Sequence, residues 1–312
     1  MVKKILLILI AAVLVLFLYV AIGRKDLTLS KSYVKEKYKV SNSHFLNWNG
    51  TEIHYTEAGS GFPVLMIHGF GGNNRDFVLL DSLINPEYRV IRVDLPGFGL
   101  SDFPDIKEED PDFIKIYGEY FNFLMDTLHL DSFYVIGNSL GGLMAWNLTV
   151  EHPGKVKKLV LFNSAGYDMK EVIKSANAKV FKYGLVKLLL KNGIPVFMTK
   201  RGISRVFYDK SLLTPERLTR VNELWNREGN LPHIMRMASS AKYLDQSLIK
   251  RITCPTLIVW GKQDKIVSPK YADRFHEDIK GSRLIVYDSC GHVPMMEKPL
   301  EVKRDVLDFF QH

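Results

Sequence analysis

Cysteine is nearly absent from this chain: only Cys254 and Cys290 occur among 312 residues. A disulfide framework or a cysteine-based metal site needs more cysteines than this. One cysteine opens an expected strand and the other follows the end of the next. We therefore expect them at opposite edges of a sheet, too far apart to bond. Nothing else in the sequence requires a metal or a cofactor, and we expect none.

Acidic residues are outnumbered, with 34 Asp and Glu against 42 Lys and Arg, which gives a formal net charge of +8. Such an excess raises nucleic acid or an anionic membrane as partners. The chain lacks zinc-finger spacing, an arginine-rich run and the aromatic signature of RNA-binding domains, so we expect no nucleic-acid partner. Internal repeats and low-complexity tracts are also absent. With 46% hydrophobic residues, the composition is that of a globular protein with an ample core.

One long apolar run stands at the N-terminus. Residues Ile5–Ile22 are 18 consecutive apolar residues with lysine or arginine on both sides. As a helix the run would reach about 27 Å, enough to cross a bilayer core. We expect residues 1–23 to form an uncleaved single-pass transmembrane anchor. The alternative is a cleaved signal peptide, whose apolar part is usually shorter, and a secreted or periplasmic protein. Basic residues are more numerous after the run, which favours a cytoplasmic side for the rest of the chain. Residues 24–43, polar and lysine-rich, are expected as a juxtamembrane linker.

From residue 44 onward, short apolar strands alternate with helical patterns. Asn49-Gly50 separates two strand-like stretches and predicts a β-hairpin. Strands followed by helices then predict a mostly parallel eight-stranded sheet covered on both faces, an α/β fold. We assign residues 44–165 and 251–312 to this core. Residues 166–250, where the alternation stops and the sequence becomes helical in character, are expected as an inserted cap.

The most informative motif is Gly137-Asn138-Ser139-Leu140-Gly141-Gly142. It follows a β-branched apolar run and precedes a helical stretch, the strand–turn–helix context that a nucleophile elbow requires. Glycines at 137 and 141 remove β-carbons where the turn is sharpest, and Gly142 lets the helix pack closely on the sheet. The motif predicts that Ser139 stands at the carboxyl edge of the sheet as a nucleophile.

A serine nucleophile needs a base, and the base needs an acid that orients it. Among the nine histidines, the candidate is His292, which follows an expected strand in Cys290-Gly291-His292-Val293-Pro294. Asp264 follows another strand, and the chain order Ser139, Asp264, His292 is the α/β-hydrolase order. Asp168 is a competitor for the acid, whereas Asn163 is an amide and cannot fill that role.

At four motifs the chain resembles α/β-hydrolase-fold serine hydrolases. They are the elbow, Gly291-His292, His68-Gly69-Phe70-Gly71-Gly72 and Asp94-x-Pro96-Gly97-x-Gly99-x-Ser101, and the resemblance covers about residues 44–312. It implies that the backbone amides of Phe70 and Leu140 form the oxyanion hole. We expect His68 to hold the oxyanion loop in place, and Asp94 and Ser101 to satisfy backbone groups in a tight turn.

Serine at the elbow indicates acyl transfer to water, because relatives that cleave halides or epoxides generally carry aspartate there. An anchored hydrolase with a Gly-Phe oxyanion loop resembles membrane-bound monoacylglycerol lipases and esterases. This implies a small-molecule carboxylic ester, such as a single-chain lipid ester, as substrate. Two alternatives stay open. The Asn-Ser pair is similar to that of carbon–carbon bond hydrolases of the meta-cleavage-product type, although these usually carry tryptophan where this chain has Val293. The other alternative is a non-catalytic binding protein on the same fold.

The basic excess is concentrated in the expected cap. Residues 166–250 contain 16 Lys and Arg but only 7 Asp and Glu. Four lysines, at 179, 182, 187 and 191, are interleaved with bulky apolar residues, which suits a helix lying on an anionic bilayer. The same pattern also suits a cap helix whose apolar side packs on the core. We expect the cap to admit a lipid ester from the membrane into an apolar tunnel above Ser139.

Overall fold

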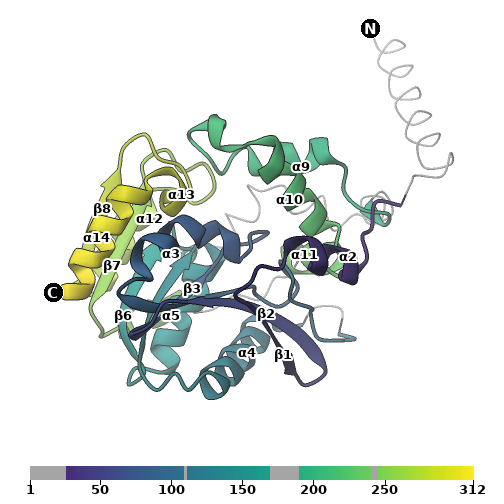
Figure 1. Cartoon of the computed structure of the whole chain (residues 1–312). Coiled ribbons are helices and arrows are strands. Elements are labelled where there is room, and N and C mark those ends of the chain that lie inside the picture. The colour runs from purple at the N-terminus through teal and green to yellow at the C-terminus, as the bar shows by residue number, and fades with distance from the viewer. Residues whose placement is uncertain (1–25, 109–110, 169–189, 240–244) are drawn as a thin grey trace, which may run out of the picture.

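The centre of the molecule is an eight-stranded sheet with the strand order β1-β2-β4-β3-β5-β6-β7-β8 (Figure 1). This computed structural model describes residues 26–108, 111–168, 190–239 and 245–312. Strands β3 to β8 are parallel to one another, and the two antiparallel pairings are those of β2 with β1 and with β4. The expected eight-stranded, mostly parallel sheet is therefore confirmed. Its strands are β1 (Ser43–Trp48), β2 (Thr51–Ala58), β3 (Phe62–Ile67), β4 (Tyr88–Val93), β5 (Phe133–Asn138), β6 (Val156–Phe162), β7 (Thr256–Gly261) and β8 (Arg283–Tyr287).

The expected hairpin joins β1 to β2. Trp48 pairs with Thr51, so Asn49 and Gly50 form a two-residue turn. Both have positive φ, 49° at Asn49 and 83° at Gly50. That conformation explains why the Asn-Gly pair predicted the turn.

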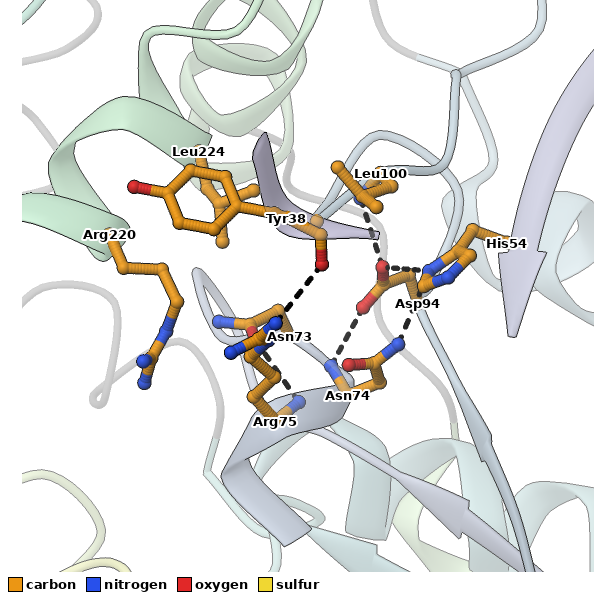
Figure 2. Close-up of a pocket in the computed structure, with 10 residues that line it drawn as sticks. Tyr38, His54, Asn73, Asn74, Arg75, Asp94, Leu100, Arg220 and Leu224 are labelled. Carbon is orange, nitrogen blue, oxygen red and sulfur yellow. Dashed lines mark hydrogen bonds and ion pairs between the residues drawn. The ribbon is translucent and has the colours of Figure 1, made fainter. Parts of the chain in front are cut away.

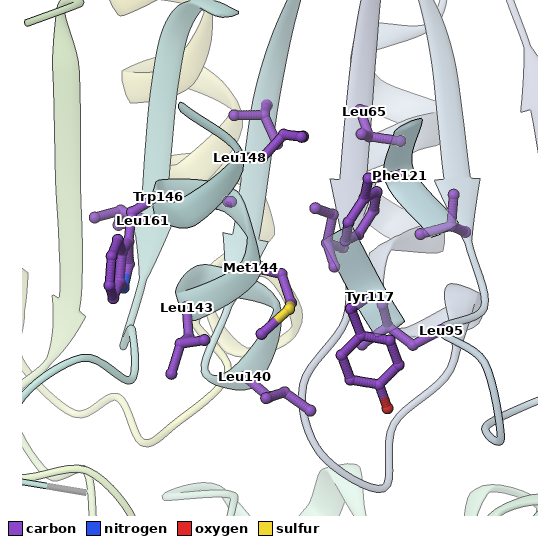
Figure 3. Packing of buried hydrophobic residues seen from close by; sticks show 14 of the residues in the cluster. Leu65, Leu95, Tyr117, Phe121, Leu140, Leu143, Met144, Trp146, Leu148 and Leu161 are labelled. Atoms are coloured by element: carbon purple, nitrogen blue, oxygen red, sulfur yellow. The ribbon is translucent and has the colours of Figure 1, made fainter. Parts of the chain in front are cut away.

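Helices cover both faces of the sheet because its central strands are apolar on both sides. Along β3, Leu65 and Ile67 belong to one core cluster, while Val64 and Met66 belong to the other. This is the two-residue period of a strand buried on both faces. Figure 3 shows the first cluster, in which Leu143 and Met144 of the elbow helix lie among apolar side chains of strands and helices. The helices on that face are α4 (Phe113–Thr127), α5 (Leu140–Glu151) and α12 (Lys270–Asp278); those on the other are α3 (Val78–Ile84), α13 (Pro294–Glu297) and α14 (Pro299–Gln311).

Between β6 and β7 the described chain is helical, as the sequence predicted for this region. Its elements are α9 (Val196–Ile203), η2 (Lys210–Leu212), α10 (Pro215–Trp225), α11 (Asn230–Ser239) and η3 (Gln246–Arg251). The cap boundaries at 166 and 250 remain a prediction. The lysine-rich stretch around residues 179–187 lies outside the described residues.

Part of the expected linker is folded onto the body of the protein. Helix α2 (Lys31–Tyr38) buries Val34 completely, against Leu100 and Leu224. The helix is also held by ion pairs such as Lys35–Glu52, at 2.7 Å. None of the helices among the described residues is long and apolar enough to span a bilayer. The expected anchor, residues 1–23, lies outside the described residues.

Candidate active site

Ser139 lies on the sharp turn between β5 and α5, with φ of 55° and ψ of −116°. A residue other than glycine rarely adopts a positive φ, and such strain persists where the surroundings enforce it. Here the N–H of Ser139 donates to Phe162 O at 3.0 Å, and its carbonyl accepts from Ala165 N at 3.0 Å. The turn therefore has the geometry of a nucleophile elbow.

The glycines of the elbow are required by close backbone approach. A β-carbon at Gly137 would lie 2.2 Å from Gly141 O, and one at Gly141 would lie 2.0 Å from Ile67 O in β3. At Gly142 the β-carbon would lie 2.5 Å from Ser164 Oγ, just after β6. These distances leave no room for a side chain, which is the reason that the sequence suggested for each glycine.

His292 and Asp264 are in direct contact. Nδ1 of His292 lies 2.7 Å from Oδ2 of Asp264, and both side chains are buried. The other carboxylate oxygen, Oδ1, accepts the backbone N–H groups of Ile266 at 2.7 Å and Val267 at 3.1 Å. A carboxylate fixed in this way keeps the proton on Nδ1 and leaves Nε2 available as a base.

The nucleophile turn is tied to the histidine loop by Asn138, the residue before Ser139. Its side-chain amide donates to His292 O at 3.0 Å and to Phe162 O at 3.0 Å. Among the described residues, Ser139 Oγ makes no hydrogen bond. The contact between nucleophile and base commonly tightens only when a substrate binds.

The competing acid, Asp168, lies elsewhere. Its carboxylate faces Arg274 at 3.4 Å, on a partly exposed surface. Asn163, by contrast, takes part in the site: its side-chain amide donates to Asp264 Oδ2 at 2.6 Å and to Gly291 O at 3.3 Å. Asn163 therefore links the loops that carry the acid and the base. The sequence excluded it as the acid but gave no signal of this bracing role.

Cap residues brace the histidine loop from the other side. The N–H of His292 donates to Val206 O at 2.8 Å. The carboxylate of Glu297 accepts the N–H of Gly291 at 2.8 Å on one oxygen and the N–H of Tyr208 at 2.8 Å on the other. The cap and the base are thus mechanically connected. No local motif marked Glu297 for this role.

The loop expected to supply Phe70 as an oxyanion donor is held by His68, as the sequence predicted. His68 is fully buried, its Nε2 accepts the N–H of Leu95 at 3.0 Å, and its Nδ1 lies 2.7 Å from Gly69 O. An Nε2 that accepts a backbone N–H requires the proton on Nδ1, which then donates to Gly69 O. Both nitrogens are occupied, so His68 has a structural role.

The loop that His68 holds lies directly beside the nucleophile. A β-carbon at Gly69 would lie 3.1 Å from Ser139 Cβ, so the residue before Phe70 touches the elbow. On its outer side, Trp225 of α10 donates from Nε1 to Gly71 O at 2.7 Å. The loop is therefore held between the elbow and the cap. Leu140, the other expected oxyanion donor, is the first residue of α5 and is buried.

A second His–Asp pair lines the small pocket of Figure 2. His54 Nδ1 lies 2.7 Å from Asp94 Oδ2, and its Nε2 lies 2.8 Å from Ser43 Oγ. The carboxylate of Asp94 also accepts the N–H groups of Asn74 and Leu100, at 2.7 and 2.9 Å. Burial disfavours its charged form, but the contact with His54 and the N–H of Leu100 bring the pKa of Asp94 below its usual value. The backbone role expected for Asp94 is confirmed.

Neither thiol offers an alternative nucleophile. Both cysteines are free, and burial raises the pKa of Cys254 to about 11 and that of Cys290 to about 12. Both are therefore protonated near neutral pH, and a protonated thiol is a poor nucleophile. Among the residues that the structure describes, no cluster of three or more His, Cys, Asp or Glu side chains could hold a metal ion.

Comparison with known proteins agrees with this geometry. Residues 63–299 match the family described as alpha/beta hydrolase fold. The chain is 30% identical over 269 residues to 2-hydroxy-6-oxo-6-phenylhexa-2,4-dienoate hydrolase of Comamonas testosteroni, a match that covers 83% of this chain and 91% of the relative.

Solved structures give the same fold. A meta-cleavage product hydrolase from Pseudomonas fluorescens superimposes with a TM-score of 0.73 at 25% identity, over 86% of this chain and 97% of that protein. A membrane phospholipase A superimposes with a TM-score of 0.73 at 22% identity, over 99% of this chain and 97% of that protein. The chain therefore belongs to the alpha/beta hydrolase fold family and is one of its hydrolases.

Proposed function

We propose that this hydrolase attacks a carbonyl carbon of a small organic substrate with Ser139. The observation that carries the proposal is the 2.7 Å contact between His292 and Asp264 next to the strained Ser139 turn. His292 Nε2 would take the Ser139 proton as the bond from Oγ to the carbonyl carbon forms, and would then deliver that proton to the leaving group. Water would next attack the acyl-enzyme, again with His292 as the base. These steps require no cofactor.

The backbone amides of Phe70 and Leu140 are the proposed oxyanion donors. The contact of Gly69 with Ser139 supports this assignment for the loop amide. The position of Leu140 at the first turn of α5 supports the other, because a helix N-terminus favours negative charge. Each donor of this kind typically lowers the barrier by about 3 to 4 kcal/mol.

The first candidate for the bond that breaks is a carbon–carbon bond next to a ketone. The sequence alone ranked carboxylic esters first. The curated relative named above, at 30% identity over most of the chain, favours the carbon–carbon alternative instead. In a 2-hydroxy-6-oxodienoate, the proton of the 2-hydroxyl group would first move to C5, which gives the 2,6-dioxo tautomer. Ser139 would then attack the carbonyl carbon C6, and the bond between C5 and C6 would break as its electrons pass to the C2 carbonyl oxygen. That oxygen would take the proton from His292, which completes the 2-hydroxydienoate product.

The second candidate is a carboxylic ester, including the single-chain lipid ester expected from the sequence. Val293 favours it, since meta-cleavage-product hydrolases usually carry tryptophan at this place. The apolar run Ile5–Ile22 favours a lipid substrate, because an anchored enzyme works beside a bilayer. We further propose that residues 1–23 are an anchor and that the hydrolase faces the cytoplasm, as the excess of basic residues after the run indicates.

Parallel assays with the two substrate classes test the proposal. The full chain is assayed with 2-hydroxy-6-oxo-6-phenylhexa-2,4-dienoate, with p-nitrophenyl esters of short and medium chain length, and with a monoacylglycerol. The substrate class with the larger kcat/KM is the class on which the enzyme acts. Turnover should vanish in Ser139→Ala with both classes, while Ser43→Ala, next to the second His–Asp pair, should keep it. Specific binding of these compounds without turnover would instead indicate a non-catalytic binding protein.

A further inference from the structure

Helix α9 exposes apolar side chains on one side and is fastened to the cap on the other. Val196 is 49% exposed, Phe197 69% and Met198 36%. Thr199 is buried, and its Oγ1 accepts a hydrogen bond of 2.8 Å from Asn222 of α10. The apolar side chains are therefore presented outward by a helix whose other side is anchored.

Two exposed basic residues follow these apolar residues, and their charges are not compensated. Lys200 and Arg201 form no ion pair with any described residue. Residues 190–208 contain four basic residues and no acidic one. The lysines of α2 differ, because Lys31 and Lys37 pair with Asp102 and Glu223 at 2.9 and 2.7 Å. Bulky apolar side chains next to unpaired basic ones suit contact with anionic headgroups. We call Val196, Phe197, Met198, Lys200 and Arg201 the α9 surface.

The N-terminal segment reaches the body of the protein directly beside this surface. The N–H of Leu27 donates to Asn192 O at 2.8 Å, and a β-carbon at Gly193 would lie 2.7 Å from Leu27 Cβ. Residues 192 and 193 stand just before α9. In Figure 1, α9 and the first described residues lie at the same end of the molecule, away from α14.

The few residues between the apolar run and Asp26 limit how far the run can lie from the contact of Leu27 with Asn192. Ile22, the last residue of the run, is four peptide units before Asp26. At about 3.3 to 3.6 Å per residue, four units span at most about 14 Å. If the run enters a bilayer, the bilayer surface must therefore lie within reach of the cap at α9.

We propose that the α9 surface rests on an anionic lipid bilayer beside the entry point of residues 5–22. Phe197 and its apolar neighbours lie among the headgroups, and Lys200 and Arg201 pair with lipid phosphates. A second copy of the chain is a poorer occupant, since a two-fold contact would bring the uncompensated cations of both copies together. The proposal concerns attachment and holds for either substrate class.

The test uses the full chain reconstituted into vesicles, with an environment-sensitive fluorophore attached at Phe197→Cys. The matched control is Leu300→Cys on α14, where the native side chain is 66% exposed. Both variants carry Cys254→Ser, because Cys254 is partly accessible while Cys290 is buried. In mixed phosphatidylcholine–phosphatidylglycerol vesicles, nitroxide-labelled lipids should quench the probe at 197 and leave the probe at 300 bright.

Charge dependence is the second readout. Lys200→Gln and Arg201→Gln should each lower the equilibrium constant for contact about fivefold, which corresponds to about 1 kcal/mol per basic residue at an anionic surface. With the unsubstituted surface, vesicles of pure phosphatidylcholine should lower the constant about 25-fold, because both basic residues then lose the anionic surface. Equal quenching at both positions, no quenching at 197, or failure of the full chain to float with vesicles would overturn the proposal. Crosslinking between two copies through position 197 would show that a second copy of the chain covers the α9 surface, and it would also overturn the proposal.

Discussion

Asn163 donates a hydrogen bond of 2.6 Å to the carboxylate oxygen of Asp264 that also contacts His292 Nδ1. The acid of the proposed triad is thus positioned by an amide at the end of β6 and by two backbone N–H groups of its own loop. Loss of a hydrogen bond to a charged group costs roughly 1.5 to 3 kcal/mol. The orientation of the base therefore depends on a residue that does not contact the substrate.

Asn163→Ala should lower kcat by about 10- to 100-fold, the equivalent of one charged hydrogen bond. Asn163→Asp should be at least as damaging, because it would place two carboxylates against each other in a buried site. The measurement is kcat on the substrate class chosen above, with urea unfolding in parallel to separate catalysis from stability. Full activity in Asn163→Ala would show that the amide does not position Asp264.

Asp264→Asn should lower turnover by about 10⁴-fold, since an amide no longer favours the working tautomer of His292. Asp168→Asn is the comparison, because Asp168 faces Arg274 rather than His292. Its kcat should stay at the level of the unsubstituted enzyme. An unchanged rate in Asp264→Asn together with a loss in Asp168→Asn would reverse the assignment of the acid.

Gly141→Ala should destabilise the fold by several kcal/mol or prevent folding, because its β-carbon would lie 2.0 Å from a backbone oxygen of β3. Gly154→Ala is the matched control, because a β-carbon there meets nothing within 4 Å. Its free energy of unfolding should change by no more than about 0.5 kcal/mol. Urea unfolding measures the free energy of unfolding of both variants. Equal values would mean that the elbow is not packed as described.

His233 should make the protein less stable in acid. It is buried beside Tyr117, and burial, with Arg236 nearby, lowers its pKa from 6.5 to about 3. Below pH 6.5, His233 therefore binds a proton in the unfolded chain but stays neutral in the folded protein until the pH approaches 3. The free energy of unfolding should fall by up to about 1.4 kcal/mol per pH unit from this residue between the two values.

His233→Gln isolates this effect, because glutamine can still bond to Tyr117 but does not titrate. The stability of the unsubstituted protein minus that of His233→Gln should decrease steadily as the pH falls from 6.5 toward 3. A difference that stays constant over this range would show that His233 titrates normally in the folded protein.

The parts of the site that the sequence predicted are those encoded by local patterns. The elbow needs only a strand, two glycines around a serine and a helix, and its context was legible around residue 139. Asp264 and His292 lie in the loops that follow β7 and β8, and parallel strands bring such loops to one sheet edge. Likewise the Asn49-Gly50 turn, whose residues both have positive φ, was predicted from two letters.

The parts that the sequence did not reveal depend on contacts between distant residues. Asn163 meets Asp264 across 101 positions, and Glu297 meets Tyr208 across 89, with no periodic pattern at either end. Helix α2 was hidden for another reason. It has a single fully buried side chain, Val34, and its lysines find their carboxylates in distant segments, so its sequence looks like a solvated linker.

Ser139, rather than another serine beside a His–Asp pair, is the proposed nucleophile. Ser43 is the sharpest control, since its Oγ lies 2.8 Å from His54, which in turn contacts Asp94. The measurement is covalent labelling of the full chain by a fluorophosphonate probe, with mass spectrometry of the modified peptide. We predict that Ser139→Ala abolishes labelling in a folded protein and that Ser43→Ala labels fully. Undiminished labelling of Ser139→Ala would show that Ser139 is not the nucleophile.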